Sequence, residues 1–337
     1  MNPILDQLCA GEHLDAAQTH QIFSRLMAGE LNAPQIAGLL IALKAKGETP
    51  EEIAGAASAL REAATPFERP DTLFADTCGT GGDGQHTVNI STAVAFVAAA
   101  MGIPVAKHGN RSVSSKCGSA DVLEACGVRL DPTPEVARRC LDEAGVCFLF
   151  APRYHAGVRH AMPVRRALGT RTMFNLLGPL ANPAKPPVQI MGVYDPALCA
   201  PLARTLGLLG CRAALVVHGS GLDELAIHGE TAAALWRDGL VTELTLCPEE
   251  AGLERYPLEA LRGGEPHENA AWLERTLCGD GAPAHKAAIA LNAGALAMIS
   301  GRAETLGDGV AAAMEVLGTD AGLEILRRLV EVSHERA

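Results

Sequence analysis

The chain has 337 residues, of which 48% are hydrophobic and only 4% aromatic, so a core built mainly from Ala, Leu, Val and Ile is expected. One hydrophobic core serves roughly 250 to 300 residues at most, so this length favours two unequal units. A net charge of −11 argues against a general nucleic-acid-binding surface, because such a surface needs a basic face.

The first 65 residues carry helical patterns. Ile36, Leu39, Leu40 and Leu43 recur at helical spacing, and Lys46-Gly47 has the basic last turn and glycine of a helix end. Thr49-Pro50-Glu51-Glu52 predicts the capped start of the next helix. We expect a small all-helical domain over residues 1–70, joined by part of residues 155–185.

From residue 72 the pattern changes to short apolar strands that alternate with helices. Strands are predicted at 72–77, 103–107, 146–150, 188–194 and 213–219, and helices at 89–101 and 120–126. Long helical patterns return at 284–300 and 321–335. This alternation predicts a large α/β domain over residues 71–337, with a mostly parallel central sheet and flanking helices.

No segment indicates a membrane span or a metal-thiolate site. The longest apolar run, 93–106, is well short of the ~20 residues that a membrane helix needs, and the N-terminus lacks the features of an export signal. The ten cysteines include no C-x-x-C pair, which argues against a zinc site and a disulfide framework. We therefore expect a cytoplasmic protein.

The first motif is DTCGTGGDGQHTVNIST, residues 76–92, which contains the spacing G-x-G-x-x-G. A dinucleotide fold would need an acidic residue about 20 positions later, but the next strand ends in Lys107–Arg111 and no acid follows until Asp121. A glycine turn before a helix can instead hold phosphate oxygens on its backbone amides. Asn89, Ser91 and Thr92 would lie in the first helical turn, where one of them could also serve only as a cap.

The second motif is KHGNRSVSSKCGSAD, residues 107–121, which combines glycines, serines and three fixed cations before another helix. Residues 84–120 and 144–194 contain no acidic residue, so both stretches suit a multiply anionic ligand. Two anion loops on adjacent strands suit a ligand with phosphates at both ends. Asp83 would repel a bare pyrophosphate and fits better against ribose hydroxyls, an amine or the cationic loop opposite.

An acidic pair, Asp223-Glu224, follows the predicted strand 213–219 and a glycine turn. Carboxylates at the carboxyl end of a strand in an α/β sheet are well placed to bind Mg²⁺ together with phosphate oxygens. The alternative is a solvated acidic pair at the start of a helix.

Three blocks of the sequence together resemble the signature blocks of the anthranilate phosphoribosyltransferases: GTGGDGQHTVNIST, KHGNRSVSSKCGSADVLEACGV and RTMFNLLGPLANP. The resemblance covers essentially the whole chain and implies a small helical domain beside a large α/β domain, in a homodimer. It also implies transfer of a phosphoribosyl group from 5-phosphoribosyl 1-pyrophosphate to the amine of anthranilate, with Mg²⁺ as cofactor, in the second step of tryptophan biosynthesis from chorismate.

The same resemblance assigns roles to residues at matching positions. Magnesium would be held by Ser91, Asp223 and Glu224, and anthranilate would face Gly79, His108, Asn110, His155 and Arg165. Phosphoribosyl pyrophosphate would be held by Gly79, Gly82, Asp83, Thr87, Asn89, Ile90, Ser91, Thr92, Lys107, His108, Gly109, Asn110, Arg111, Ser112, Val113, Ser114, Ser115 and Ser119. Cys117 stands where the family commonly has Ser. No general base is assigned, because a neutral aromatic amine needs no deprotonation before attack.

Two alternative functions remain at this point. Pyrimidine nucleoside phosphorylases share part of the second and third blocks, and would use the same loops for phosphate while cleaving nucleosides. A non-catalytic, nucleic-acid-binding relative of the fold is disfavoured by the net charge and by the intact Asp223-Glu224 pair. The predicted partners are therefore the two small-molecule substrates, with no nucleic acid and no membrane.

Overall fold

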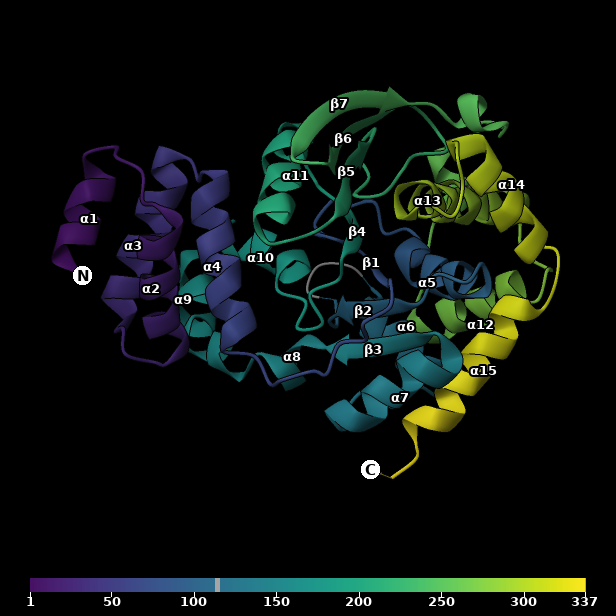
Figure 1. Cartoon of the computed structure of the whole chain (residues 1–337), viewed down its shortest axis with the longest axis horizontal. Coiled ribbons are helices and arrows are strands. Elements are labelled where there is room, and N and C mark those ends of the chain that lie inside the picture. Colours follow the sequence, from purple (N-terminus) through teal and green to yellow (C-terminus); the bar gives the residue numbers. More distant parts are fainter. Residues whose placement is uncertain (113–115, 337) are drawn as a thin grey trace.

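A computed structural model describes residues 1–112 and 116–336. The chain opens with four helices: α1 (Asn2–Cys9), α2 (Ala16–Met27), α3 (Ala33–Lys46) and α4 (Pro50–Glu62). The predicted capping box at the start of α4 is present, because Thr49 Oγ1 accepts from the Glu52 amide and Glu52 Oε2 accepts from the Thr49 amide. These helices form the purple unit at one end of the molecule (Figure 1).

A seven-stranded sheet forms the centre of the molecule, with the order β3-β2-β1-β4-β5-β6-β7. Strands β1 to β5 are mutually parallel, whereas β6 and β7 pair antiparallel. The strands are β1 (Ala75–Gly79), β2 (Val105–Gly109), β3 (Val146–Phe150), β4 (Val188–Gly192), β5 (Ala213–Gly219), β6 (Thr231–Arg237) and β7 (Leu240–Leu246). The predicted fold class is confirmed, and all five predicted strands are present.

The β6–β7 hairpin was not predicted. It turns at Asp238-Gly239, where both residues have positive φ, of 52° and 82°. An Asp-Gly pair between two strands is a strong local signal for such a turn, and it was in the sequence. The hairpin extends the parallel sheet at its β5 edge.

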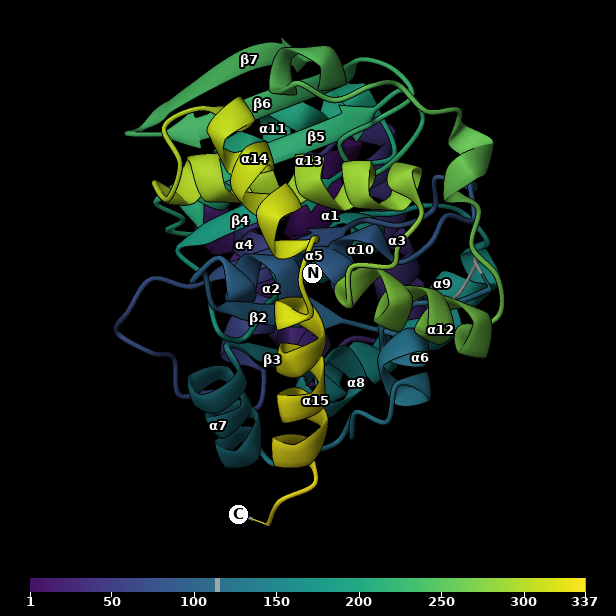
Figure 2. The same cartoon turned by 90° about the vertical axis from the view of Figure 1, so that its right-hand side faces the viewer.

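Further helices follow along the chain, and several of them cover the two faces of the sheet. They are α5 (Ile90–Ala100), α6 (Ser119–Ala125), α7 (Pro134–Ala144), α8 (Ala151–Tyr154), α9 (Met162–Leu168), α10 (Phe174–Leu180), α11 (Cys199–Leu208), α12 (Pro266–Leu277), α13 (Pro283–Ser300), α14 (Leu306–Val316) and α15 (Ala321–Ser333). One of them, α9, packs against α3 of the N-terminal unit. Figure 2 shows α13, α14 and α15 on the side of the sheet away from the N-terminal helices.

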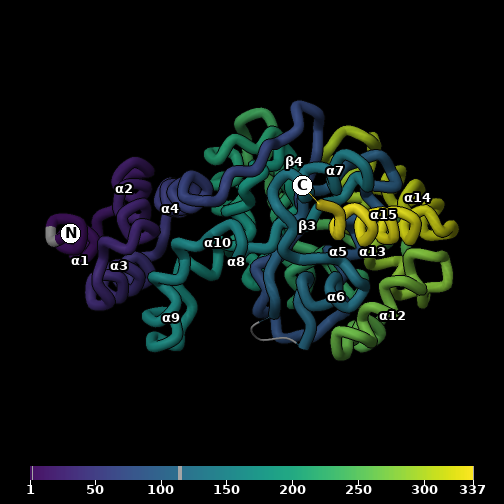
Figure 3. Tube along the Cα trace, turned by 90° about the horizontal axis from the view of Figure 1, so that it is seen from below, coloured from purple at the N-terminus to yellow at the C-terminus, as the bar shows by residue number. Residues whose placement is uncertain are grey.

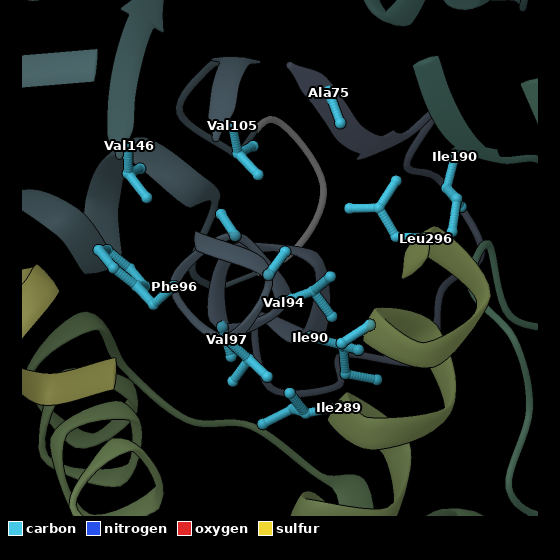
Figure 4. Packing of buried hydrophobic residues seen from close by; sticks show 14 of the residues in the cluster. Ala75, Ile90, Val94, Phe96, Val97, Val105, Val146, Ile190, Ile289 and Leu296 are labelled. Carbon is cyan, nitrogen blue, oxygen red and sulfur yellow. The ribbon is translucent and has the colours of Figure 1, made fainter. Parts of the chain in front are cut away.

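Alternate residues along the strands belong to two different hydrophobic clusters. Ile190 and Leu215 join the cluster that contains α5 and α13, as the packing of Ile90, Val94 and Leu296 in Figure 4 illustrates. Met191 and Val216, on the other face, join a cluster formed with α10, α11 and the N-terminal helices. This division follows from the two-residue period of a strand, which points successive side chains to opposite faces.

The N-terminal helices share their hydrophobic cluster with α9, α10 and α11. In Figure 3, α9 lies beside α3, and α4 leads from the helical unit toward the sheet. Because this cluster continues to one sheet face, the domain boundary near residue 70 remains a prediction. Within the part of the chain that the structure describes, no helix is long and apolar enough to span a membrane.

Candidate active site

The candidate site lies at the carboxyl ends of the parallel strands. The chain runs from β1 outward through β2 to β3, and then returns to place β4 on the other side of β1. Ligands of open α/β sheets bind at the carboxyl edge, at the point where the strand order reverses. The loops that follow β1, β2 and β5 meet at this edge, and they carry the predicted site residues.

The loop after β1 needs its glycines for two different reasons. Gly81, Gly82 and Gly84 have φ of 67°, 80° and 74°, which side chains rarely tolerate. A Cβ at Gly79 would lie 2.1 Å from Asp223 Oδ2, so this glycine leaves room for the loop after β5. The Gly81 amide donates to the same Asp223 oxygen at 2.7 Å. The glycine loop is therefore packed against the acidic pair.

Three carboxylates gather where these two loops meet. Asp223 interacts with Asp83 and with the Gly81 amide, and Glu224 Oε1 accepts from the Ser91 amide at 3.1 Å. Burial raises the pKa of Asp223, and Asp83 raises it further. Burial also raises the pKa of Glu224, with Asp223 as the next cause. The site thus concentrates negative charge that a bound cation would stabilise.

The structure excludes the alternative reading of Asp223-Glu224 as a solvated pair at a helix start. Both residues lie in a loop and are partly buried. The adjacent loop is held by Asn292 of α13, whose side chain accepts from the Leu225 amide at 3.0 Å and donates to the Leu225 carbonyl at 3.2 Å. Among residues 1–112 and 116–336, no three His, Cys, Asp or Glu side chains form a metal-binding group. A cation here would need oxygens of a ligand as well.

Lys107 and the start of α5 form the floor of the site. Lys107 Nζ is buried on β2 and donates to the Thr77 carbonyl at 2.5 Å and to Ser91 Oγ at 3.2 Å. Its charge partly offsets that of Glu224. Ile90 is buried in the core and offers the site only backbone atoms. Thr92 Oγ1 is buried without a hydrogen-bond partner in the described structure.

Asn89 is the residue before α5, but it does not cap the helix through its side chain. Its side-chain Nδ2 donates to the Cys117 carbonyl at 3.1 Å, and its side-chain Oδ1 accepts from Asn269 Nδ2 at 2.9 Å. Asn89 therefore ties the first loop to the second loop and to α12. Asn269, which the sequence analysis did not single out, completes this link. Thr87 forms an isolated bridge with Arg262.

The second loop is organised by Asp121. Its Oδ2 accepts from the amides of Ser112 and Gly118 at 3.0 and 2.8 Å, which closes the loop on itself. Arg111, predicted to face the ligand, pairs with Asp121 and Glu124 at 3.0 and 2.7 Å. The Arg111 side chain is 45% exposed, so these are surface ion pairs, and its contact with a ligand stays a prediction.

Of the other residues predicted in this loop, some make contacts within the loop and some lie outside the described residues. Gly109 sits against Ser119, where a Cβ would lie 2.4 Å from the serine Oγ, and Ser119 Oγ donates to the Asn110 carbonyl at 3.3 Å. Three predicted residues lie outside the described residues: Val113, Ser114 and Ser115.

Two neutral histidines lie side by side: His108 on β2, just before this loop, and His155 directly after α8. The rings of His108 and His155 are 5.1 Å apart in an edge-to-face arrangement. Burial is the main cause that lowers the pKa of His108 to about 3 and that of His155 to about 4. The Nε2 atoms of both rings are buried without a hydrogen-bond partner in the described structure. Buried polar atoms rarely lack partners, so both rings are candidates to contact a ligand.

Two arginines from the acid-free segment 144–194 pack over aromatic rings. Arg165 packs over the Phe174 ring at 5.1 Å, and none of the ion pairs found among the described residues involves it. Arg171 stacks on Tyr194 at 3.8 Å and donates to the Gly82 carbonyl at 2.6 Å. Arg171 was not predicted as a site residue, although the missing acids around it were a signal.

Comparison with known proteins decides the family. Models of the glycosyl transferase family match the chain twice, the helical bundle domain over residues 2–64 and the a/b domain over residues 71–322. The anthranilate phosphoribosyltransferase of Sorangium cellulosum is 62% identical over 100% of this chain and 97% of its own length. This chain belongs to the anthranilate phosphoribosyltransferase family.

Solved structures of the family have the same fold. The anthranilate phosphoribosyltransferase of Thermus thermophilus superposes with a TM-score of 0.94 at 45% identity, covering 98% of this chain and 99% of that one. The Saccharomyces cerevisiae enzyme, solved in complex with phosphoribosyl pyrophosphate and Mg, gives a TM-score of 0.88 at 27% identity, covering 98% and 96%. The predicted family and its glycosyltransferase class are thereby confirmed.

Proposed function

We propose that this chain transfers the phosphoribosyl group of 5-phosphoribosyl 1-pyrophosphate to the amine of anthranilate, releasing pyrophosphate. The observation that carries the proposal is the meeting of two anion-binding loops and a carboxylate pair at the reversal point of the sheet, beside two neutral histidines. High identity to curated anthranilate phosphoribosyltransferases supports the same activity, the second step of tryptophan biosynthesis from chorismate.

The charged half of the site, which we define as Gly79, Gly82, Asp83, the start of α5 and the loop after β2, would bind phosphoribosyl pyrophosphate. Backbone amides at the start of a helix attract phosphate oxygens, and here Ser91 and Thr92 add hydroxyls to those amides. Lys107 supplies a buried positive charge between the two loops. Arg171, held against Gly82, adds a second cation that the sequence analysis missed.

Magnesium fits the donors present. Burial and a neighbouring carboxylate raise the pKa values of Asp223 and Glu224, so a cation would stabilise their anionic forms, and carboxylate and hydroxyl oxygens are the ligands that Mg²⁺ prefers. We propose that Asp223, Glu224 and Ser91 hold it. When bound, the ion would neutralise charge that develops on the pyrophosphate leaving group.

The amine half of the site, which we define as His108, Asn110, His155 and Arg165, would bind anthranilate. A carbonyl oxygen can only accept, so His108 Nδ1 must carry the proton that it donates to the Gly178 carbonyl at 3.0 Å. His108 Nε2 is therefore an acceptor, suited to an N–H of the aromatic amine. The guanidinium fork of Arg165 matches the substrate carboxylate.

This arrangement supports catalysis by positioning rather than by proton removal. An aniline-type amine is neutral at pH 7, and a histidine with a pKa of about 3 is a weak base. Holding the amine in line with the ribose carbon would supply much of the acceleration. We propose no general base. We also propose that the chain forms a homodimer and acts in the cytoplasm.

The function is tested by mixing the protein with anthranilate, phosphoribosyl pyrophosphate and Mg²⁺ and following the loss of anthranilate fluorescence. We expect loss that requires all three components, with pyrophosphate released in equal amount. Parallel reactions with thymidine or uridine and inorganic phosphate test the nucleoside phosphorylase alternative. Cleavage of a nucleoside without consumption of anthranilate would overturn the proposal.

A further inference from the structure

The carboxyl end of α10 is held by three donors from three different elements. The Gly178 carbonyl accepts from His108 Nδ1 of β2 at 3.0 Å, and the Pro179 carbonyl accepts from Gln189 Nε2 of β4 at 2.8 Å. The Leu180 carbonyl accepts from Arg61 Nε of α4 at 2.7 Å. The last carbonyls of a helix have no partner within the helix, so these bonds fix where α10 ends.

Arg61 is a buried cation that binds helix ends instead of a carboxylate. The residue is only 7% exposed, and its Nη1 also donates to the Leu209 carbonyl, at the end of α11, at 3.2 Å. The ion pairs found in residues 1–112 and 116–336 do not include Arg61. The carboxyl end of a helix carries partial negative charge, which stabilises a cation placed there. Arg61 thus joins the helical unit to two helices of the α/β unit.

Both histidines of the amine half lie within reach of this junction. His108 is bonded to Gly178, two residues before the carbonyl that Arg61 holds. Backbone groups of Leu60 and Ala181, the direct neighbours of Arg61 and Leu180, act on the His155 ring. The charge of Arg61 also acts on both rings, although burial has the larger effect. Displacing Arg61 would therefore disturb both histidines.

We propose that Arg61 is a positioning residue for the amine half of the site. By holding the end of α10, Arg61 fixes the position of the Gly178 carbonyl, which orients the ring of His108. The ring of His155 packs beside that of His108. The inference rests on the proposed function in assigning these histidines to anthranilate. Without this support the His108 ring loses a defined acceptor for Nδ1–H, and Nε2 ceases to be a dedicated acceptor for the amine. Among the described residues, neither the charged half nor the loop after β5 makes a hydrogen bond to Arg61, whose bonds go to Leu180 and Leu209.

The test compares Arg61→Lys and Arg61→Met with the wild type. Arg61→Lys keeps the charge but cannot hold two helix ends with one planar fork. We expect the KM for anthranilate to rise by about tenfold, as the loss of one hydrogen bond to the substrate would give, while the KM for phosphoribosyl pyrophosphate changes by less than about twofold. If Arg61→Met does not fold, Arg61→Lys carries the test.

A matched control comes from the same helix. Glu52 of α4 is also buried, and it accepts from the Leu14 amide at 2.9 Å and pairs with Lys46 at 2.9 Å, with no bond to α10. Glu52→Gln should lower thermal stability and leave the ratio of the two KM values unchanged. An equal change of that ratio in Glu52→Gln would show that Arg61 has only a general structural role, and would overturn the proposal.

A second measurement separates this inference from the proposed function. Nitrogen-15 spectra of the histidine rings in the substrate-free protein report which ring nitrogen carries the proton. We expect His108 to be protonated at Nδ1 in the wild type and to show a mixture of tautomers in Arg61→Lys. If the wild type does not consume anthranilate, the proposed function is wrong. The spectra would still test the link between Arg61 and His108, because they need no substrate. Unchanged His108 signals and unchanged KM values in Arg61→Lys would overturn the inference.

Discussion

The two halves of the site differ in how they are built. The charged half consists of backbone amides and a buried lysine of β2, and it lies beside the carboxylates of the loop after β5. The amine half consists of two neutral rings whose orientation depends on α10 and whose surroundings include α4 of the helical unit. The charged half suits a polyanionic donor, whereas the neutral rings of the amine half suit an uncharged amine and Arg165 would meet the carboxylate of anthranilate. Each prediction below separates the two halves or shows that they cannot be separated.

The largest effect concerns the neutral rings. The folded protein keeps His108 and His155 uncharged to pH values of about 3 and about 4, whereas the unfolded chain protonates them near their ordinary pKa of 6.5. The unfolded state therefore binds more protons below pH 6.5, so stability falls as the pH falls. Between pH 7.5 and 5.0 the pair should cost about 4 kcal/mol. Denaturant unfolding of the wild type and of His108→Gln/His155→Gln at both pH values measures the difference.

In that comparison the double variant should lose less stability than the wild type on acidification. Equal losses would show that the histidines are solvated in the folded state, and the amine half would no longer be a neutral region.

The next effect concerns the carboxylates. Asp223→Asn/Glu224→Gln should raise the Mg²⁺ concentration for half-maximal activity and lower the rate at limiting metal by on the order of 100-fold. Because these carboxylates are partly buried and short of positive charge, their loss should not lower the stability of the metal-free protein. Glu243→Gln, an exposed carboxylate on β7, is the control. A Mg²⁺ titration superimposable on that of the wild type would place the metal elsewhere.

A smaller effect is expected from Arg165→Ala. Loss of a charged hydrogen-bonding fork should raise the KM for anthranilate roughly tenfold, with little change for phosphoribosyl pyrophosphate. The exposed neighbour Arg166, replaced by Ala, should change neither constant. Equal damage to both constants in Arg165→Ala would mean that this arginine serves the packing against Phe174 rather than the substrate.

The smallest effect is expected from Cys117→Ser. The contact of this residue with Asn89 is made by its backbone carbonyl, which the substitution keeps. Steady-state kinetics should show a change of less than about twofold in either KM. A larger change in the KM for phosphoribosyl pyrophosphate would show that the thiol itself shapes the second loop.

The sequence predicted the features that local patterns determine. The capping box at Thr49, the five parallel strands and the glycine turn each follow from residues a few positions apart, as the contact between Thr49 and Glu52 illustrates. The β6–β7 hairpin was missed although its Asp238-Gly239 turn carried a local signal.

What the sequence could not predict depends on contacts between distant segments. The link of Asn89 to Asn269, 180 residues further along the chain, is one such contact. Asn182, which donates to buried Asp76 at 2.9 Å across more than a hundred residues, has no local pattern that reveals it. The roles carried over from the family blocks, such as His155 and Arg165, likewise depend on how α9 and α10 pack.

The most direct test of the division into two halves is the equilibrium binding of Mg²⁺-phosphoribosyl pyrophosphate, measured by calorimetry without anthranilate. We expect Arg165→Ala to bind it within about twofold of the wild-type affinity, and Asp223→Asn/Glu224→Gln to bind it at least about tenfold more weakly. Equal weakening in both variants, or normal binding by the carboxylate variant, would contradict the assignment of the charged half to the phosphoribosyl donor.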